Sequence, residues 1–497
     1  MNDAIEKKIS RMNISEKIGQ LLMVGVSGQK PDDVVFHRMN NQKIASFLLF
    51  QKNTPNAEKT RALTHELHAM AKKRDLDPLL IAIDQEHGRV TRINQGVTIL
   101  PAAYGLGRLN HPEYVYTACK ISGTELNSLG INVNFAPVAD VNTNPANPII
   151  GTRSYGEEPE SVARMVKGAI KGYRDAGMIC AAKHFPGHGD VSVDSHLELP
   201  ICDKTIKELY QAELIPFESS IAESVPMIMT AHVLFPQIDS KWPATLSPVF
   251  LTQILRSQLQ YNGVIISDDL EMKALNQYGR IPDLAVQMIV AGCDMLIISE
   301  NLSHEVSVDE IYVALTHAVQ QEIISEHRLD QSVKRILKLR QMHRDDSKYS
   351  PDLCSHSDHQ QISQKMMKEI FYENPHSSHF PRTVTNNSLV LSDVSTVLDK
   401  IKQTCSLVQT QMLDDRFSKN ELQHLLADKS EIFIFLSQTK WLSRFHEIRY
   451  SNNQSIHFFS LNNPYIQSKI QFPLTSYINL YAACLPLSVF NLIFSVA

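Results

Sequence analysis

The chain has 497 residues, more than one hydrophobic core ordinarily serves, so we expect two or three domains. Hydrophobic residues make up 43% of the sequence and charged residues 20%, which is typical of a soluble globular protein. The net charge is −5 at pH 7 and no block of Lys and Arg stands out, which argues against a nucleic-acid partner.

The cysteines and the two ends of the chain bear on its cellular compartment. Seven cysteines are scattered without a CxxC pair, which argues against a disulfide framework and favours a reducing compartment. The opening segment MNDAIEKKISRMNISEK is charged and lacks the apolar stretch of a secretory signal, so we expect a cytoplasmic protein. Residues 478–497 are mostly apolar, but Asn479, Pro486 and Asn491 interrupt them. We interpret this segment as a buried helix followed by a buried strand, and expect no membrane span.

Apolar, β-branched runs recur through the first 300 residues. They do not alternate with polar residues, as expected of strands that are buried on both faces. The eight runs are residues 20–26, 44–50, 78–84, 131–140, 178–185, 226–232, 263–269 and 294–300.

Helical patterns lie between most of these runs, with apolar residues spaced three and four apart. They cover residues 56–74, 113–130, 161–177, 247–260 and 283–292, and Gly177 is a predicted C-cap. Alternating strands and helices predict a closed (β/α)8 TIM-type barrel, with an open doubly wound sheet as the alternative. The count of eight and the polar residue after nearly every strand favour the barrel.

The chain beyond the predicted barrel indicates a second, smaller unit. Residues 311–344 read as two helices, after which the periodicity disappears into Ser, Asp and His. Shorter α/β signals follow at 388–393, 395–405, 431–437, 455–462 and 489–496. We therefore predict a barrel domain over 1–344, a linker over 345–365 and a small α/β sandwich-like domain over 366–497.

Charged and polar residues collect where the predicted barrel strands end. They are Asp84, Lys183, His184, His232, Ser267, Asp268, Asp269 and Glu300. Such residues would be costly in a dry core, but at the mouth of a barrel they converge on one cleft. The alternation of side chains along a strand predicts that only one of Asp268 and Asp269 lines that cleft. The other can cap the following helix, and a cap alone is the simpler alternative.

The loop KHFPGHGDVSVDSH, residues 183–196, is the most polar of these strand ends. Its possible metal ligands are His184, His188, Asp190, Asp194 and His196. No HExxH or CxxC spacing is present, and Lys183 would repel a cation, so we expect neither a metal nor a cofactor. Gly187 and Gly189 make the loop pliable. Asp194 can orient His196 and favour its imidazolium, which makes His196 a candidate general acid; a solvated surface histidine is the alternative.

These motifs together resemble glycoside hydrolase family 3, and within it the β-N-acetylglucosaminidases of NagZ type. KHFPGHG followed by DSH is similar to the signature of that group, and the similarity covers most of residues 15–340. The other matching segments are IDQEHGRVTR (83–92), NFAPVADV (134–141), GTRSYG (151–156), MTAHVLFP (229–236), ATLSP (244–248) and GVIISDDLEM (263–272).

The resemblance implies roles for particular residues. Asp268 corresponds to the nucleophile, His196 to the acid/base and Asp194 to its partner. The residues implied to bind an N-acetylglucosamine unit are Asp84, Arg92, Arg153, Lys183 and His184. This sequence departs from the family at 86–88, where Glu-His-Gly replaces the usual Glu-Gly-Gly. His87, which lacks the freedom of glycine, therefore stands in the turn after Asp84.

The activity implied by the resemblance is that of a retaining exo-β-N-acetylglucosaminidase that works by double displacement. Its implied substrate is a carbohydrate, a muropeptide fragment met in the cytoplasm during cell-wall recycling. Four alternatives stay open: attack by the substrate's own acetamido oxygen, a family 3 β-glucosidase, a phosphorylase that uses phosphate in place of water, and an inactive sugar-binding protein. The sequence makes no prediction about the oligomeric state.

Overall fold

The computed structural model describes most of the first 373 residues and separate segments after them. The described residues are 2–195, 197–301, 307–342 and 351–373, and then 378, 382–384, 388–393, 395–404, 408–413, 419–427, 429–436, 445, 448, 454–460, 476–479 and 494–496.

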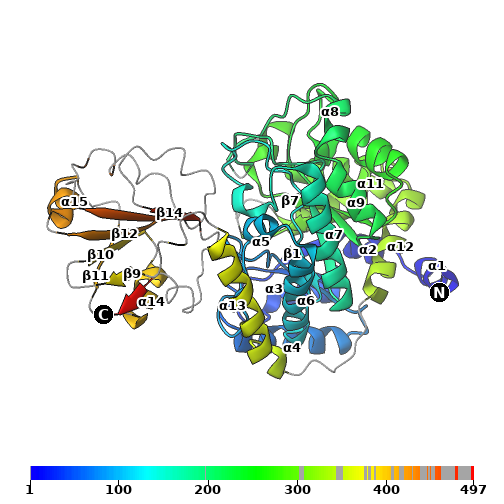
Figure 1. Ribbon diagram of the computed structural model, residues 1–497. Coiled ribbons are helices and arrows are strands. Elements are labelled where there is room, and N and C mark those ends of the chain that lie inside the picture. The colour runs from blue at the N-terminus through cyan, green and yellow to red at the C-terminus, as the bar shows by residue number, and fades with distance from the viewer. Residues whose placement is uncertain are drawn as a thin grey trace.

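Eight parallel strands form a closed barrel in chain order, with the last strand paired to the first (Figure 1). They are β1 (Leu22–Gly25), β2 (Ser46–Leu49), β3 (Leu80–Ile83), β4 (Val133–Asn134), β5 (Ile179–Phe185), β6 (Met227–Thr230), β7 (Val264–Asp269) and β8 (Met295–Ile298). Each lies within one of the eight predicted runs. The prediction of a barrel is therefore confirmed, and the open sheet is excluded.

Helices surround this barrel, and several of them begin at a side-chain cap. The described helices of this part are α1 (Asn2–Ile9), α2 (Ile14–Leu21), α3 (Asp33–Asn41), α4 (Ala57–Lys72), α5 (Ala103–Leu109), α6 (Pro112–Ser128), α7 (Pro159–Asp175), α8 (Ile206–Gln211), α9 (Ile215–Ala222), α10 (Ile281–Ala291), α11 (Val308–Gln320) and α12 (Glu326–Met342), with a wider π-type helix at Val249–Gln258. Asn13, Asp32 and Asn56 cap α2, α3 and α4 by accepting a backbone N–H. Gly177 follows α7 with a φ of +73°, which confirms the predicted C-cap.

The fourth strand is much shorter than the predicted run of 131–140. Its regular ladder ends at Asn134, whose side chain accepts from the backbone N–H of Gln85 at 3.0 Å, and one isolated parallel bridge joins Val138 to Lys183 further on. Pro137 follows and has no N–H to give to a neighbouring strand. Residues 135–142 nevertheless remain buried, so this connection passes through the interior and reaches the carboxyl end of the barrel.

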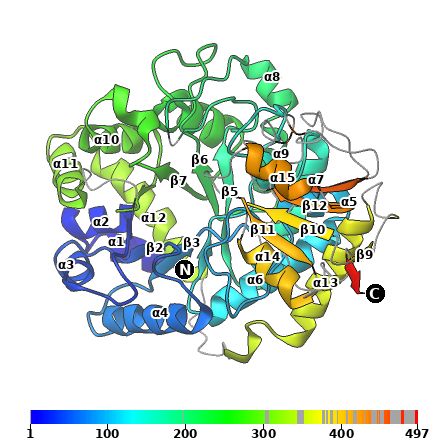
Figure 2. The same cartoon turned by 90° about the vertical axis from the view of Figure 1, so that its left-hand side faces the viewer.

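A separate parallel sheet with its own hydrophobic core follows in the C-terminal part. Its order is β11-β10-β12-β13-β14, and β15 pairs with β9 in a second small sheet. The elements are β9 (Arg382–Val384), β10 (Ser388–Ser392), α14 (Ser395–Thr404), β11 (Gln409–Met412), α15 (Lys419–Leu426), β12 (Glu431–Leu436), β13 (Ser455–Ser460), β14 (Ser476–Asn479) and β15 (Phe494–Val496). The predicted fold class, a barrel followed by a smaller α/β unit, is confirmed. Figures 1 and 2 place this unit beside the barrel, near α5.

A long helix, α13 (Ser357–Tyr372), connects the two parts and packs on the barrel. Its buried residues Met366, Met367, Ile370 and Phe371 recur at helical spacing, and Ile370 shares a small apolar cluster with Tyr104. At its start, His359 Nδ1 lies 2.8 Å from a carboxylate oxygen of the buried Glu125. Residues 357–365 of the predicted linker therefore belong to an ordered helix. Its polar first turn is what hid the apolar periodicity in the sequence.

The apolar C-terminal segment of residues 478–497 lies largely outside the described residues, including the helix predicted there. In the part of the chain that is described, no helix is both long enough and apolar enough to cross a membrane.

Candidate active site

A cavity of about 360 Å³ lies at the carboxyl end of the barrel. This volume is at the lower end of the range for small-molecule sites. Six of the residues predicted for the site line it, namely Asp84, Arg92, Arg153, Lys183, His184 and Asp268. The structure thus brings together side chains from β3, β5, β7 and two connecting loops, as expected for this end of a barrel.

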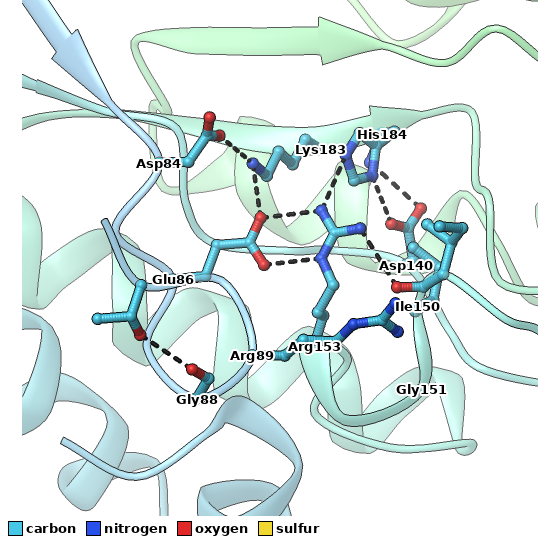
Figure 3. A network of polar contacts seen from close by, with 12 residues as sticks. Asp84, Glu86, Gly88, Arg89, Asp140, Ile150, Gly151, Arg153, Lys183 and His184 are labelled. Carbon is cyan, nitrogen blue, oxygen red and sulfur yellow. Dashed lines mark hydrogen bonds and ion pairs between the residues drawn. The ribbon is translucent and has the colours of Figure 1, made fainter. Parts of the chain in front are cut away.

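A chain of alternating charges forms one wall of the cavity (Figure 3). Lys183 Nζ lies 2.8 Å from Asp84 Oδ1 and 2.7 Å from Glu86 Oε1. Arg153 donates to both oxygens of Glu86, at 2.8 and 2.9 Å. Arg92 stands further out, 3.5 Å from the other oxygen of Asp84. The wall therefore offers cations and anions in fixed positions, which suits the hydroxyl and amide groups of a sugar.

Glu86 holds this wall together, although the sequence interpretation assigned it no role. Burial alone would raise the pKa of Glu86, but the charges of Arg153 and Lys183 outweigh burial and hold its pKa far below the ordinary range. The pKa of Lys183 is raised, because Asp84 and Glu86 more than offset its own burial. Glu86 thus stays ionised and fixes both cations.

Glu86→Gln is expected to lower kcat/KM by roughly 100-fold for a sugar substrate, since a neutral amide cannot serve both Arg153 and Lys183. Steady-state kinetics on the folded variant measure the effect. Glu58→Gln, on the exposed surface of α4, is the control and should leave kcat/KM unchanged. An unchanged kcat/KM in Glu86→Gln would show that the wall does not need this carboxylate.

Asp268 reaches the cavity from the carboxyl end of β7. Its Oδ1 accepts the backbone N–H of Asp269 at 2.8 Å. Burial would raise the pKa of Asp268, but its electrostatic interactions with His184 and His232 and this hydrogen bond lower it below the ordinary value. Burial raises the pKa of the neighbouring Asp269 to about 7, and the charge of Glu271 adds to the rise. The two adjacent carboxyls therefore titrate in different pH ranges: Asp268 is fully ionised at neutral pH, whereas Asp269 is still changing its protonation there.

The prediction that only one of Asp268 and Asp269 lines the cleft is wrong, because both border the cavity. The pairing of β7 with β8 is irregular between Ile266 and Asp269, and such a register shift breaks the strict alternation of side chains. Asp269 Oδ1 also accepts the backbone N–H groups of Glu271 and Ser299, both at 3.2 Å. The next helical segment, Lys273–Tyr278, has Met272 as its N-cap and no side-chain cap, so the capping alternative is not borne out.

Three other strand-end residues are not among the residues that line the cavity. Ser267 is fully buried, and its Oγ accepts the backbone N–H of Ile297 at 3.0 Å. Glu300 pairs instead with Arg38 at 3.1 Å. His232 is fully buried, and its Nε2 donates to the backbone carbonyl of Asp269 at 3.0 Å. His232 therefore supports the end of β7 through the carbonyl of Asp269, and its electrostatic interaction with Asp268 favours the ionised carboxylate.

The polar loop after β5 divides into a fixed half and a more exposed half. Residues 183–189 are buried, and a β-carbon at Gly189 would overlap the carbonyl of Val141. Gly189 thus allows two backbone segments to pack closely, which is a different role from the pliability predicted for it. His188 Nε2 lies 3.1 Å from Ser195 Oγ, and Asp194 is half-buried at the more exposed end. His196, the predicted acid/base, lies outside the described residues, so its geometry relative to Asp268 stays a prediction.

His87 occupies the turn in which the family usually has a glycine. Its φ is +70°, so the left-handed backbone is kept even with a side chain. His87 Nε2 lies 2.8 Å from Ser122 Oγ, and burial lowers the pKa of His87 to about 4. A neutral imidazole hydrogen-bonded in this way allows the turn after Asp84 to form without glycine.

Among the described residues, no group of three or more His, Cys, Asp or Glu side chains is arranged to hold a metal ion.

The chain is similar to known proteins in both sequence and fold. The pattern of the Glycosyl hydrolase family 3 N terminal domain matches residues 13–339. Beta-hexosaminidase A of Pseudoalteromonas piscicida is 37% identical over 317 residues, which are 60% of this chain and only 53% of that protein. This chain therefore spans about half the length of that relative.

Two solved structures are also similar. A glycoside hydrolase family 3 beta-N-acetylglucosaminidase from Paenibacillus sp. str. FPU-7 is 31% identical, with a TM-score of 0.86 over 97% of this chain and 95% of that one. NagZ from Neisseria gonorrhoeae, solved with N-trifluoroacetyl-D-glucosamine, is 31% identical, with a TM-score of 0.52 over 64% of this chain and 97% of that one. The matches extend over the whole barrel and the cavity at its carboxyl end, and this chain belongs to glycosyl hydrolase family 3.

Proposed function

We propose that the protein is a retaining exo-β-N-acetylglucosaminidase. The observation that carries this proposal is the cavity itself, in which an ionised Asp268 faces a wall of fixed cations and anions. The similarity to a beta-N-acetylglucosaminidase over nearly the whole chain supports the choice of sugar.

The size of the cavity supports removal of one terminal sugar at a time. About 360 Å³ is small for a site that would hold several sugar rings of an oligosaccharide. Asp84, Arg92, Arg153, Lys183 and His184 are proposed to bind that single N-acetylglucosamine unit. The substrate proposed on the aglycone side is a muropeptide or amino-sugar oligosaccharide fragment.

The proposed reaction is a double displacement. The Asp268 carboxylate attacks the anomeric carbon while the bond to the leaving oxygen breaks, and His196 gives that oxygen a proton. Water then gives a proton back to His196 and its oxygen to the anomeric carbon, which frees Asp268. Asp194 is proposed to orient His196. Retaining enzymes hold the two reacting groups about 5–5.5 Å apart, a separation that this mechanism requires of Asp268 and His196.

Turnover of nitrophenyl N-acetyl-β-glucosaminide tests the proposed activity. The matched substrate is nitrophenyl β-glucoside, which differs only at the 2-position. Faster release of nitrophenol from the first supports the proposal. Faster release from the glucoside would make the protein a β-glucosidase, and no release from either would favour an inactive sugar-binding protein.

Added phosphate is expected to divert part of the product to N-acetylglucosamine 1-phosphate. The proposed base, His196, is neutral at that step and repels an incoming anion less than a carboxylate would. Phosphorus NMR of the reaction mixture measures the sugar phosphate, and sulfate at equal ionic strength is the control. Only free N-acetylglucosamine in the presence of phosphate would contradict this expectation.

The setting proposed for this activity is cell-wall recycling in the cytoplasm. The free thiols of the described cysteines Cys119, Cys180, Cys202, Cys293 and Cys354 support a reducing compartment. The division into a catalytic domain over 1–344, a linker over 345–365 and a small α/β domain over 366–497 is part of the same proposal, except that α13, which crosses the boundary at 365, is assigned to the barrel on which it packs. Separate hydrophobic cores in the two parts support it.

A further inference from the structure

Asp140 is a fully buried carboxylate behind the cavity to which the proposed mechanism gives no role. It follows the fourth strand, in the buried connection after β4, and points at His184 (Figure 3). Burial would raise the pKa of Asp140, but its close interaction with the His184 ring and the hydrogen bonds that it accepts outweigh burial, so the pKa is lowered and the carboxylate is ionised.

The two oxygens of Asp140 have different partners. Oδ1 accepts two backbone N–H groups, that of His184 at 3.2 Å and that of His188 at 2.7 Å. Oδ2 lies 2.7 Å from Nδ1 of the His184 ring. An ionised carboxylate has no proton to donate, so Nδ1 must carry the proton of this hydrogen bond.

The other side of the His184 ring faces Arg153. Nη2 of Arg153 lies 3.4 Å from Nε2 of His184. A guanidinium has donors and no acceptor, so Nε2 presents a lone pair to it. The charged and titratable groups that surround this ring are Asp140, Arg153, Lys183, His188 and Asp268. Both neighbours in direct contact therefore favour the same neutral tautomer, with the proton on Nδ1.

We propose that Asp140 is a positioning residue that holds His184 in the Nδ1–H tautomer, so that Nε2 carries the lone pair. Arg153 approaches this lone pair only to 3.4 Å in the sugar-free protein, and a hydroxyl of the bound sugar donates to it in place of Arg153. The proposal rests on the proposed function, because it takes the ligand to be a sugar. In this tautomer His184 accepts a hydrogen bond from the sugar, whereas Arg153 and Lys183 supply the hydrogen-bond donors of the wall.

Asp140→Asn tests this assignment because it keeps the shape of the side chain and reverses the direction of the hydrogen bond with His184 Nδ1. The two backbone N–H groups require the amide oxygen at the Oδ1 position, so the NH₂ group of Asn replaces Oδ2. Nδ1 must then accept, and the proton moves to Nε2, where it opposes the Arg153 donor. We expect kcat/KM to fall by about 10–100-fold, as is usual when the group that fixes a histidine tautomer is lost.

The decisive measurement is the ¹⁵N spectrum of the histidine side chains in the sugar-free protein at neutral pH, with His184→Gln identifying the His184 signals. We expect a protonated Nδ1 and an unprotonated Nε2, and the reverse in Asp140→Asn. A proton on Nε2 of the native ring, alone or with one on Nδ1, overturns the proposal, as does an unchanged spectrum in Asp140→Asn. If that variant does not fold, the native spectrum decides alone.

Asp294→Asn is the matched control, since it removes another fully buried carboxylate that precedes β8, at the opposite end of the barrel. It should lower stability and leave the His184 signals unchanged. The spectrum is recorded without substrate, so it stands whatever the nitrophenyl assay shows. Absence of activity in that assay would refute the proposed function, whereas the wrong tautomer would refute only the role of Asp140.

Discussion

Asp268→Asn is expected to lower kcat for nitrophenyl N-acetyl-β-glucosaminide by a factor on the order of 10⁴ or more. An amide in place of the carboxylate cannot form the glycosyl ester on which double displacement depends. The neighbouring groups that keep the Asp268 pKa low, among them His184, His232 and the backbone N–H of Asp269, would have no anion left to stabilise. Steady-state kinetics measure the loss, and circular dichroism checks that the variant is folded.

Asp269→Asn is the matched comparison, because it changes the adjacent carboxyl of the same strand end. Burial raises the pKa of Asp269 to about 7, and an Asn oxygen can still accept the N–H groups of Glu271 and Ser299. This variant should lose far less activity than Asp268→Asn. Equal losses in the two variants would mean that Asp268 has no special role.

A 2-fluoro sugar distinguishes covalent attack by Asp268 from attack by the substrate's own acetamido oxygen. The fluorine slows breakdown of a glycosyl-enzyme, so the sugar should accumulate as an ester on the peptide that contains Asp268. Digestion and mass spectrometry locate the label. Label on another residue would contradict the assigned nucleophile, and substrate assistance would leave no label at all.

The order of the barrel strands and most of the charged residues of the cavity could be predicted from sequence. Strands buried on both faces are apolar throughout, so a polar residue such as Asp84 or Lys183 directly after one marks the carboxyl end of a barrel. Asp140 gives the same signal after the run of 131–140. It was missed because its partner His184 is 44 positions further on, and local patterns do not show which distant side chains meet.

Other features depend on backbone geometry that a sequence pattern does not carry. The irregular pairing that brings both Asp268 and Asp269 to the cavity follows from how β7 and β8 fit together. Glu86 also gave no sign of its role, because its two partners, Arg153 and Lys183, come from separate loops and strands. Glu300 looked like a cavity residue by position, but Arg38 on α3 holds it elsewhere.

The largest expected effect on stability concerns Asp294, at the amino end of β8. This fully buried carboxylate accepts from Arg256, from Ser332 Oγ at 2.7 Å and from Arg335 at 3.1 Å, and also from the backbone N–H of Ile265 at 3.0 Å. It thus ties β7 to α12 and to the helix at Val249–Gln258. Burial would raise the pKa of Asp294, but the charges of Arg256, Arg335 and Arg328 outweigh burial and lower it.

Asp294→Asn is expected to lower the free energy of unfolding of the barrel by about 3 kcal/mol at neutral pH, because it leaves partly buried guanidinium groups without their anion. The folded-state pKa is below the unfolded value of about 3.9, so the contribution of this carboxylate is fully present above pH 5. It is lost as the pH falls through the folded-state pKa. The difference between native protein and variant should therefore shrink in acid, as urea unfolding at several pH values would measure.

Asp283→Asn, at an exposed position in the first turn of α10, is the control for this measurement. A surface substitution of this kind should change the unfolding free energy by no more than about 0.5 kcal/mol. A difference for Asp294→Asn that is constant between pH 3 and pH 7 would mean that packing, and not the charge of Asp294, stabilises this end of the barrel. Asp294 lies at the end of the barrel opposite the cavity, so the Asp294→Asn variant should keep its kcat/KM as long as it remains folded. This result would distinguish a carboxylate that stabilises the fold, at the amino end of the barrel, from the carboxylates proposed to act on the substrate at the carboxyl end.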